Sequence, residues 1–129
     1  MTSERELIAA FLAEDVRTGD ITTELTTPDS RGRATIHCEE NAVVAGLRYA
    51  GMVFELMEVD YELIAEDGSR VEEGQEVMRL EGPLRGIMSC ERTALNIIMR
   101  MSGIATTTAA VLESCRARNP KIRIAGTRK

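Results

Sequence analysis

The first third of the chain predicts a helix, then a polar connection, then a strand. Ser3 lies three residues before Glu6, which is the spacing of a capping box at the start of a helix. Apolar residues recur at helical spacing over residues 7–12, and the polar segment 17–30 ends that pattern. Over residues 33–38 apolar and polar side chains alternate, which predicts a half-buried strand.

The middle of the chain predicts a second helix and several short strands. The apolar segment NAVVAG, residues 41–46, is typical of a short strand that ends in a turn. From Leu47, apolar residues follow at i+3, i+4, i+7 and i+10, which predicts a helix. Residues 61–65 predict a further strand, and residues 71–82 predict two short strands separated by Gly74.

Helical spacing returns at Leu84, directly after the Gly-Pro pair at 82–83. We expect Gly103 to interrupt this helix, and a further helix to end before the Asn-Pro pair at 119–120, because the residue before proline avoids helical geometry. Isoleucines then alternate with basic residues over 121–124, which predicts a new strand. Together the elements indicate an α+β fold.

One side of the helix from Leu84 carries three arginines when the sequence is placed on a wheel of 3.6 residues per turn. This polar stripe consists of Arg85, Ser89, Arg92, Asn96 and Arg100. Each guanidinium is a planar fork of donors that suits a carboxylate or a phosphate. A solvated helix face, or ion pairs with the acidic first part of the chain, would explain the same stripe, and the wheel alone leaves the three arginines equivalent.

Charge is distributed very unevenly along the 129 residues, whose net charge is −5. Residues 1–82 hold 7 Lys or Arg and 19 Asp or Glu, whereas residues 83–129 hold 9 and 2, so the two parts carry −12 and +7. The basic part is therefore expected to face an anion or an acidic partner. With an acidic total and only two Phe, two Tyr and no Trp, nucleic-acid binding is not expected.

Few residues suit metal or redox chemistry. The three cysteines, Cys38, Cys90 and Cys115, are far apart and form no CxxC, which is typical of free thiols in a reducing cytoplasm. His37 lies on the polar face of its predicted strand, so we expect a surface residue and no zinc site. The N-terminus lacks a secretory pattern, and no apolar run approaches the roughly 20 residues of a membrane span.

The segment 71–82 resembles the hairpin of biotinyl and lipoyl carrier domains. A carrier needs an exposed lysine at a turn, and the two lysines, Lys121 and Lys129, lie far from this segment. We therefore expect an α/β-hammerhead-like shape with a biotinyl/lipoyl-like hairpin but without a carrier function.

Three motifs resemble the quinolinate phosphoribosyltransferase family, also called the carboxylating nicotinate-nucleotide pyrophosphorylases. They are GPLRGIMSCERTALNIIMRMSGIATTT at 82–108, GTRK at 126–129, and EDVRTGDITTE at 14–24. The resemblance implies an N-terminal domain over residues 1–105. Residues 106–129 would then be the first helix and strand of a truncated C-terminal α/β barrel, and such a chain alone is expected to be inactive.

The family reaction implied is transfer of the phosphoribosyl group of phosphoribosyl pyrophosphate to quinolinate, with loss of CO2, to give nicotinate mononucleotide and pyrophosphate for NAD biosynthesis. Mg2+ would accompany the pyrophosphate. By resemblance, Arg92 binds a quinolinate carboxylate in the site of a partner subunit of a homodimer or higher oligomer. Thr127, Arg128 and Lys129 match the TRK motif and would bind substrate from the same chain, with Lys129 also catalytic. No residue of this chain is implied to bind the metal.

One departure from the family pattern leaves two alternatives open. Many members have an acidic residue directly before TRK, where this chain has Gly126. That variant also fits a related group associated with molybdenum transport, whose substrate differs. A non-catalytic dimerisation or interaction domain is the alternative from another functional class.

Overall fold

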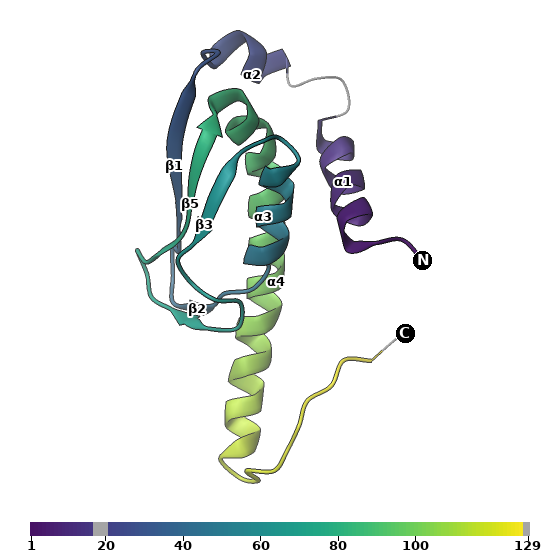
Figure 1. Ribbon diagram of the computed structural model, residues 1–129. Helices are drawn as coiled ribbons and strands as arrows, with labels where there is room; N and C mark the ends of the chain where they lie inside the picture. Colours follow the sequence, from purple (N-terminus) through teal and green to yellow (C-terminus); the bar gives the residue numbers. More distant parts are fainter. Residues whose placement is uncertain (17–20, 128–129) are drawn as a thin grey trace.

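The computed structural model describes residues 1–16 and 21–127, and within them four helices and five strands (Figure 1). The helices are α1 (Glu4–Asp15), α2 (Ile21–Thr26), α3 (Leu47–Glu55) and α4 (Leu84–Arg116). The strands are β1 (Arg31–His37), β2 (Ala42–Val43), β3 (Asp60–Leu63), β4 (Arg70–Val71) and β5 (Glu76–Pro83). The mixed α and β composition confirms the predicted class. Helix α2 was not predicted, because its threonine-rich sequence is a poor helix former.

The strands form two separate antiparallel sheets. One has the order β1-β5-β3, with Ile36 opposite Met78 and Leu63 opposite Met78 on the other side. The other pairs β2 with β4. The prediction of a hairpin over residues 71–82 is wrong. Its two strands, β4 and β5, belong to different sheets and do not pair with each other. Strand pairing is set by contacts distant in sequence, which the local pattern at Gly74 does not contain.

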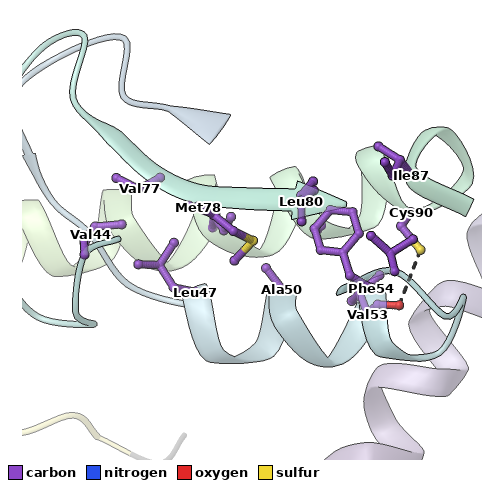
Figure 2. Packing of buried hydrophobic residues seen from close by; sticks show 14 of the residues in the cluster. Val44, Leu47, Ala50, Val53, Phe54, Val77, Met78, Leu80, Ile87 and Cys90 are labelled. Atoms are coloured by element: carbon purple, nitrogen blue, oxygen red, sulfur yellow. Dashed lines mark hydrogen bonds between the residues drawn. The ribbon is translucent and has the colours of Figure 1, made fainter. Parts of the chain in front are cut away.

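The hydrophobic core lies between the inner face of the three-stranded sheet and helices α3 and α4, as Figure 2 shows. Strand β1 alternates between exposed and half-buried residues, as predicted, so its apolar side chains face this core. The largest fully buried side chains come from α3, α4, β5 and the residues next to β2 and β3: Phe54, Leu47, Met78, Val44, Val53, Val59, Val77 and Cys90. With so few aromatic residues, aliphatic packing supplies most of the burial.

Helix α1 begins at the predicted capping box. The Ser3 hydroxyl accepts from the Glu6 backbone N–H, and the Glu6 carboxylate accepts from the Ser3 N–H. Ile8 and Leu12 bury the inner side of the helix against the core. The N-terminal end is also held to α3, since Glu4 pairs with Arg48.

Helix α4 is one continuous element of 33 residues, so the predicted interruption at Gly103 is wrong. Glycine inside a helix costs about 1 kcal/mol relative to alanine. Contacts on both sides of Gly103 support the helix: the Ser102 Oγ accepts from the Ala45 N–H and the Thr106 Oγ1 accepts from the Val43 N–H, each at 2.9 Å. The lower half of α4 continues beyond the strands in Figure 1.

The strand predicted at 121–124 is not formed: residues 122–127 have no regular structure. No neighbouring strand in the described part of the chain supplies the hydrogen bonds that a strand requires. The proposed domain boundary at 105/106 falls inside α4 and stays a prediction.

Candidate functional site

The three arginines of the polar stripe on α4 differ in their surroundings. The Arg85 Nε donates to the Thr27 carbonyl oxygen at 3.1 Å, and its Nη2 donates to the Glu24 carbonyl oxygen at 3.3 Å. These carbonyls close the C-terminal end of α2, where a cation is favourable. Arg85 is therefore engaged in holding α2 against α4.

Arg92 lies in the first third of α4, and its side chain is exposed. Among residues 1–16 and 21–127, no hydrogen bond or ion pair engages its guanidinium. The structure therefore leaves a fork of charged donors available to an anion at this position. This distinction between Arg85 and Arg92 was not accessible from the helical wheel.

Arg100 is likewise exposed, and no ion pair is formed by it within the described part of the chain. It borders a groove of about 910 Å3 between α1 and α4. Apolar side chains such as Phe11 and Met99 form much of that groove. Its polar lining consists of Glu14, Asp15, Tyr49, Thr93, Asn96 and Arg100.

A partly buried hydrogen bond joins the two walls of this groove. The Thr93 hydroxyl donates to the Asp15 Oδ2 at 2.5 Å, and Thr93 is only 3% exposed. The helical pattern did not identify this residue. The sequence does contain an indication that Thr93 is buried, because Thr93 follows Ile87 and Cys90 at the spacing of the buried face of α4.

The predicted C-terminal site residues are only partly described. Thr127 is exposed in the irregular segment after α4, and no hydrogen bond joins it to Arg92 in the described residues. Arg128 and Lys129 lie outside the described residues. The assembly of the predicted site from Arg92, Thr127, Arg128 and Lys129 therefore stays a prediction.

The acidic and basic parts of the chain differ in how their cationic side chains are paired. Six arginines of the first 82 residues form ion pairs, namely Arg5, Arg31, Arg33, Arg48, Arg70 and Arg79. Among the described residues after 82, no arginine or lysine does so, and Glu113 alone reaches back, to Arg70. An ion-pair seam between the two parts therefore does not account for the basic stripe.

The cysteines and His37 lie in surroundings that suit a structural role. The three cysteines are free, and burial raises the pKa of the Cys90 thiol to about 12. His37 is exposed as expected, with its Nε2 2.8 Å from the Thr35 Oγ1 and its Nδ1 3.2 Å from the Gly74 carbonyl oxygen. Within the described ranges, no three His, Cys, Asp or Glu side chains gather to hold a metal, so those residues do not fit a magnesium site.

Helix α4 is long and apolar enough to cross a membrane by length and composition, the one such helix among the described residues. The expectation drawn from runs of apolar residues did not anticipate this. One such helix is weak evidence for a membrane span, since a long helix of a soluble protein can pass the same test.

Comparison with known proteins gives one consistent result. Residues 20–102 match the family model "Quinolinate phosphoribosyl transferase, N-terminal domain". A probable nicotinate-nucleotide pyrophosphorylase [carboxylating] of Methanothermobacter thermautotrophicus is 41% identical over 96% of this chain, and the protein of that name from Mycobacterium leprae is 39% identical over 92%. The chain spans 45% and 44% of the length of these relatives.

Solved structures agree. The nicotinate-nucleotide pyrophosphorylase from Francisella tularensis matches 85% of this chain with a TM-score of 0.81 and 30% identity, over 40% of its own length. NadC from Streptococcus pyogenes matches 84% with a TM-score of 0.79 and 34% identity, again over 40% of its length. These comparisons do not favour a non-catalytic interaction domain or a molybdenum-transport homologue. The chain belongs to the quinolinate phosphoribosyl transferase family and carries the N-terminal domain of that family.

Proposed function

We propose that this chain supplies the N-terminal part of a carboxylating nicotinate-nucleotide pyrophosphorylase. The reaction joins the ring nitrogen of quinolinate to the phosphoribosyl group of phosphoribosyl pyrophosphate, with release of pyrophosphate and CO2, in NAD biosynthesis. The observation that carries the proposal is the 41% identity over nearly the whole chain to a relative of that name.

The chemistry needs cations, because both substrates carry several negative charges and the leaving pyrophosphate gains more in the transition state. Arg92 suits this need, since its guanidinium is exposed and unengaged by the described residues. In the proposal Arg92 binds a quinolinate carboxylate through its planar fork. Thr127, Arg128 and Lys129 bind substrate from their own chain, with Lys129 also catalytic.

The proposed enzyme is a homodimer or higher oligomer in which Arg92 reaches the site of the partner subunit. Large apolar side chains on α4 are exposed, among them Met88, Met99 and Ile104. Such a surface suits burial against a partner subunit. Mg2+ would enter with phosphoribosyl pyrophosphate as part of that substrate. The free thiols fit a cytoplasmic location.

The test uses two proteins: the chain alone, and the chain joined after Lys129 to the part of the Methanothermobacter relative that lies beyond the match. Each is supplied with quinolinate and phosphoribosyl pyrophosphate and assayed for nicotinate mononucleotide. We expect product from the joined protein and none from the chain alone. Enzyme-like turnover by the chain alone, or a folded joined protein without turnover, would contradict the proposal.

In the joined protein, Arg92→Ala is expected to lower kcat/KM while the thermal midpoint stays unchanged. Loss of a hydrogen bond between ionised partners costs about 1.5–3 kcal/mol, or about one to two decades of rate. Arg92→Lys should recover little, because an ammonium cannot reproduce the planar fork. Arg116→Ala, a basic exposed position at the end of the same helix, is the matched control and should retain activity.

A further inference from the structure

The hydrogen bond between Thr93 and Asp15 connects two motifs that are distant in sequence. Asp15 is the last residue of α1 and belongs to EDVRTGDITTE, whereas Thr93 belongs to ERTALN on α4. Their separation is 78 residues, and the acceptor is a carboxylate oxygen at 2.5 Å. No other hydrogen bond between side chains joins α1 to α4 in the described part of the protein.

The other side-chain polar contacts of α1 with described residues of other elements lie at its opposite end. Glu4 contacts Arg48 and the Tyr49 hydroxyl, and Arg5 pairs with Glu55, all on α3. Apolar contacts of Ile8 and Leu12 resist separation of the helices but are not directional. Among the described residues, the bond to Thr93 is therefore the directional contact that fixes where the C-terminal end of α1 lies against α4.

Arg92 directly precedes Thr93, so any rotation of this part of α4 moves its guanidinium. Side-chain ends lie about 5–6 Å from a helix axis, so a rotation of about 10° displaces them by about 1 Å. A displacement of that size is enough to cost about a hundredfold in a reaction that depends on alignment. Thr93 faces α1 while Arg92 faces away from the core, so fixing Thr93 sets the direction of Arg92.

We propose that Thr93 and Asp15 are positioning residues for Arg92, and that their bond sets the orientation in which Arg92 meets the quinolinate carboxylate. This inference rests on the proposed function. Neither Thr93 nor Asp15 is proposed to contact the substrate. Its signature is a specific effect on quinolinate, whereas a purely structural role would lower stability without that specificity.

The test measures KM for each substrate, kcat and the thermal midpoint in the joined protein. Thr93→Val and Asp15→Ala each break the bond, and the exposed position of Asp15 makes its variant safe for folding should Thr93→Val not fold. Each should raise KM for quinolinate about tenfold. A displacement of about 1 Å can cost about a hundredfold, and we expect the loss of one hydrogen bond to displace Arg92 by less than that. KM for phosphoribosyl pyrophosphate should stay within about twofold, and the double variant should add nothing further. Thr93→Ser keeps the hydroxyl and should restore the parent value.

Ser102→Ala is the matched control, because it removes a hydroxyl of the same helix that binds the backbone of Ala45. It should lower the thermal midpoint and leave KM for quinolinate unchanged. If Thr93→Val and Asp15→Ala do no more to that KM than Ser102→Ala, while Arg92→Ala raises it, the positioning role is overturned and the proposed function stands. If Arg92→Ala also leaves it unchanged, the assignment of Arg92 itself fails.

Discussion

Cys90 places an ionisable thiol in the core between α3 and α4. It is fully buried, and its Sγ donates to the Val53 carbonyl oxygen at 3.4 Å (Figure 2). Burial disfavours the thiolate, which raises the pKa of Cys90 to about 12. A thiol in an unfolded chain titrates near 8.5, so between these values the unfolded state loses a proton that the folded state keeps.

The expected result is a loss of stability as pH rises above about 9, because the unfolded state then binds fewer protons than the native state. At pH 10.5, about two pH units above the unfolded-state pKa, the loss of stability due to Cys90 should be about 3 kcal/mol, since one pKa unit is worth 1.36 kcal/mol. Urea unfolding at pH 8, 9.5 and 10.5 measures it, with Cys90→Ala as the comparison. Cys38, Tyr49 and Tyr61 also have raised pKa values and remain in both proteins. Equal pH slopes for parent and variant would refute this account of Cys90.

At the scale of elements, α4 contains two glycines with opposite surroundings. A Cβ added to Gly86 would lie 2.9 Å from the Met57 carbonyl oxygen, whereas one added to Gly103 would meet nothing within 4 Å. The first approach involves backbone, which cannot move aside cheaply. Gly86 is therefore required for close packing against the segment after α3, and Gly103 is not.

Gly86→Ala should destabilise the protein by about 1–3 kcal/mol through overpacking. Gly103→Ala should stabilise it by up to about 1 kcal/mol, because alanine is the better helix former and α4 is continuous there. Thermal or urea unfolding of the two variants decides the matter. A stabilised Gly86→Ala would show that α4 packs differently, and a destabilised Gly103→Ala would indicate a break in the helix at that position.

The segment after α4 provides a separate test of element structure. Over residues 121–127 the hydrogen bonds in the described structure are from the Lys121 and Ile122 amides, both to Asn119. Amides 123–127 should therefore exchange with solvent rapidly, and those of the buried part of α4 around Ala94 slowly. Hydrogen exchange resolved by residue measures both. Slow exchange at 123–127 would mean that another chain supplies a strand next to this segment.

Local patterns predicted the elements whose signals are local. The capping box at Ser3, the alternation in β1 and the apolar spacing after Leu47 each depend on near neighbours, and each is confirmed. The partner of β4 and the continuity of α4 through Gly103 depend on distant contacts, and both predictions failed. The same reason hid the engagement of Arg85 with α2 and the bond between Thr93 and Asp15.

At the scale of the whole molecule, the ion pairs of the described residues lie almost entirely within the acidic part, and the described arginines and lysines after residue 82 form none. The surface pairs contribute little to stability individually, and their effect here is to give an acidic partner to each described arginine of the first 82 residues. The family motifs, unlike the wheel, singled out Arg92 from the stripe. In the described residues Arg85 is engaged by α2 and Arg92 has no hydrogen-bond or ion-pair partner, and the role of Arg92 stays a prediction.

The most direct test of the account is a hybrid dimer of two inactive joined proteins, one with Arg92→Ala and the other with Lys129→Ala, co-expressed with different tags and purified through both. If Arg92 acts across the interface, one site of each hybrid has an intact arginine from one chain and an intact lysine from the other. The hybrid should then show about half the activity of the parent dimer, because one of its two equivalent sites is complete. A hybrid that forms and makes no nicotinate mononucleotide would contradict the account, and Arg92 would then act within its own chain or not at all.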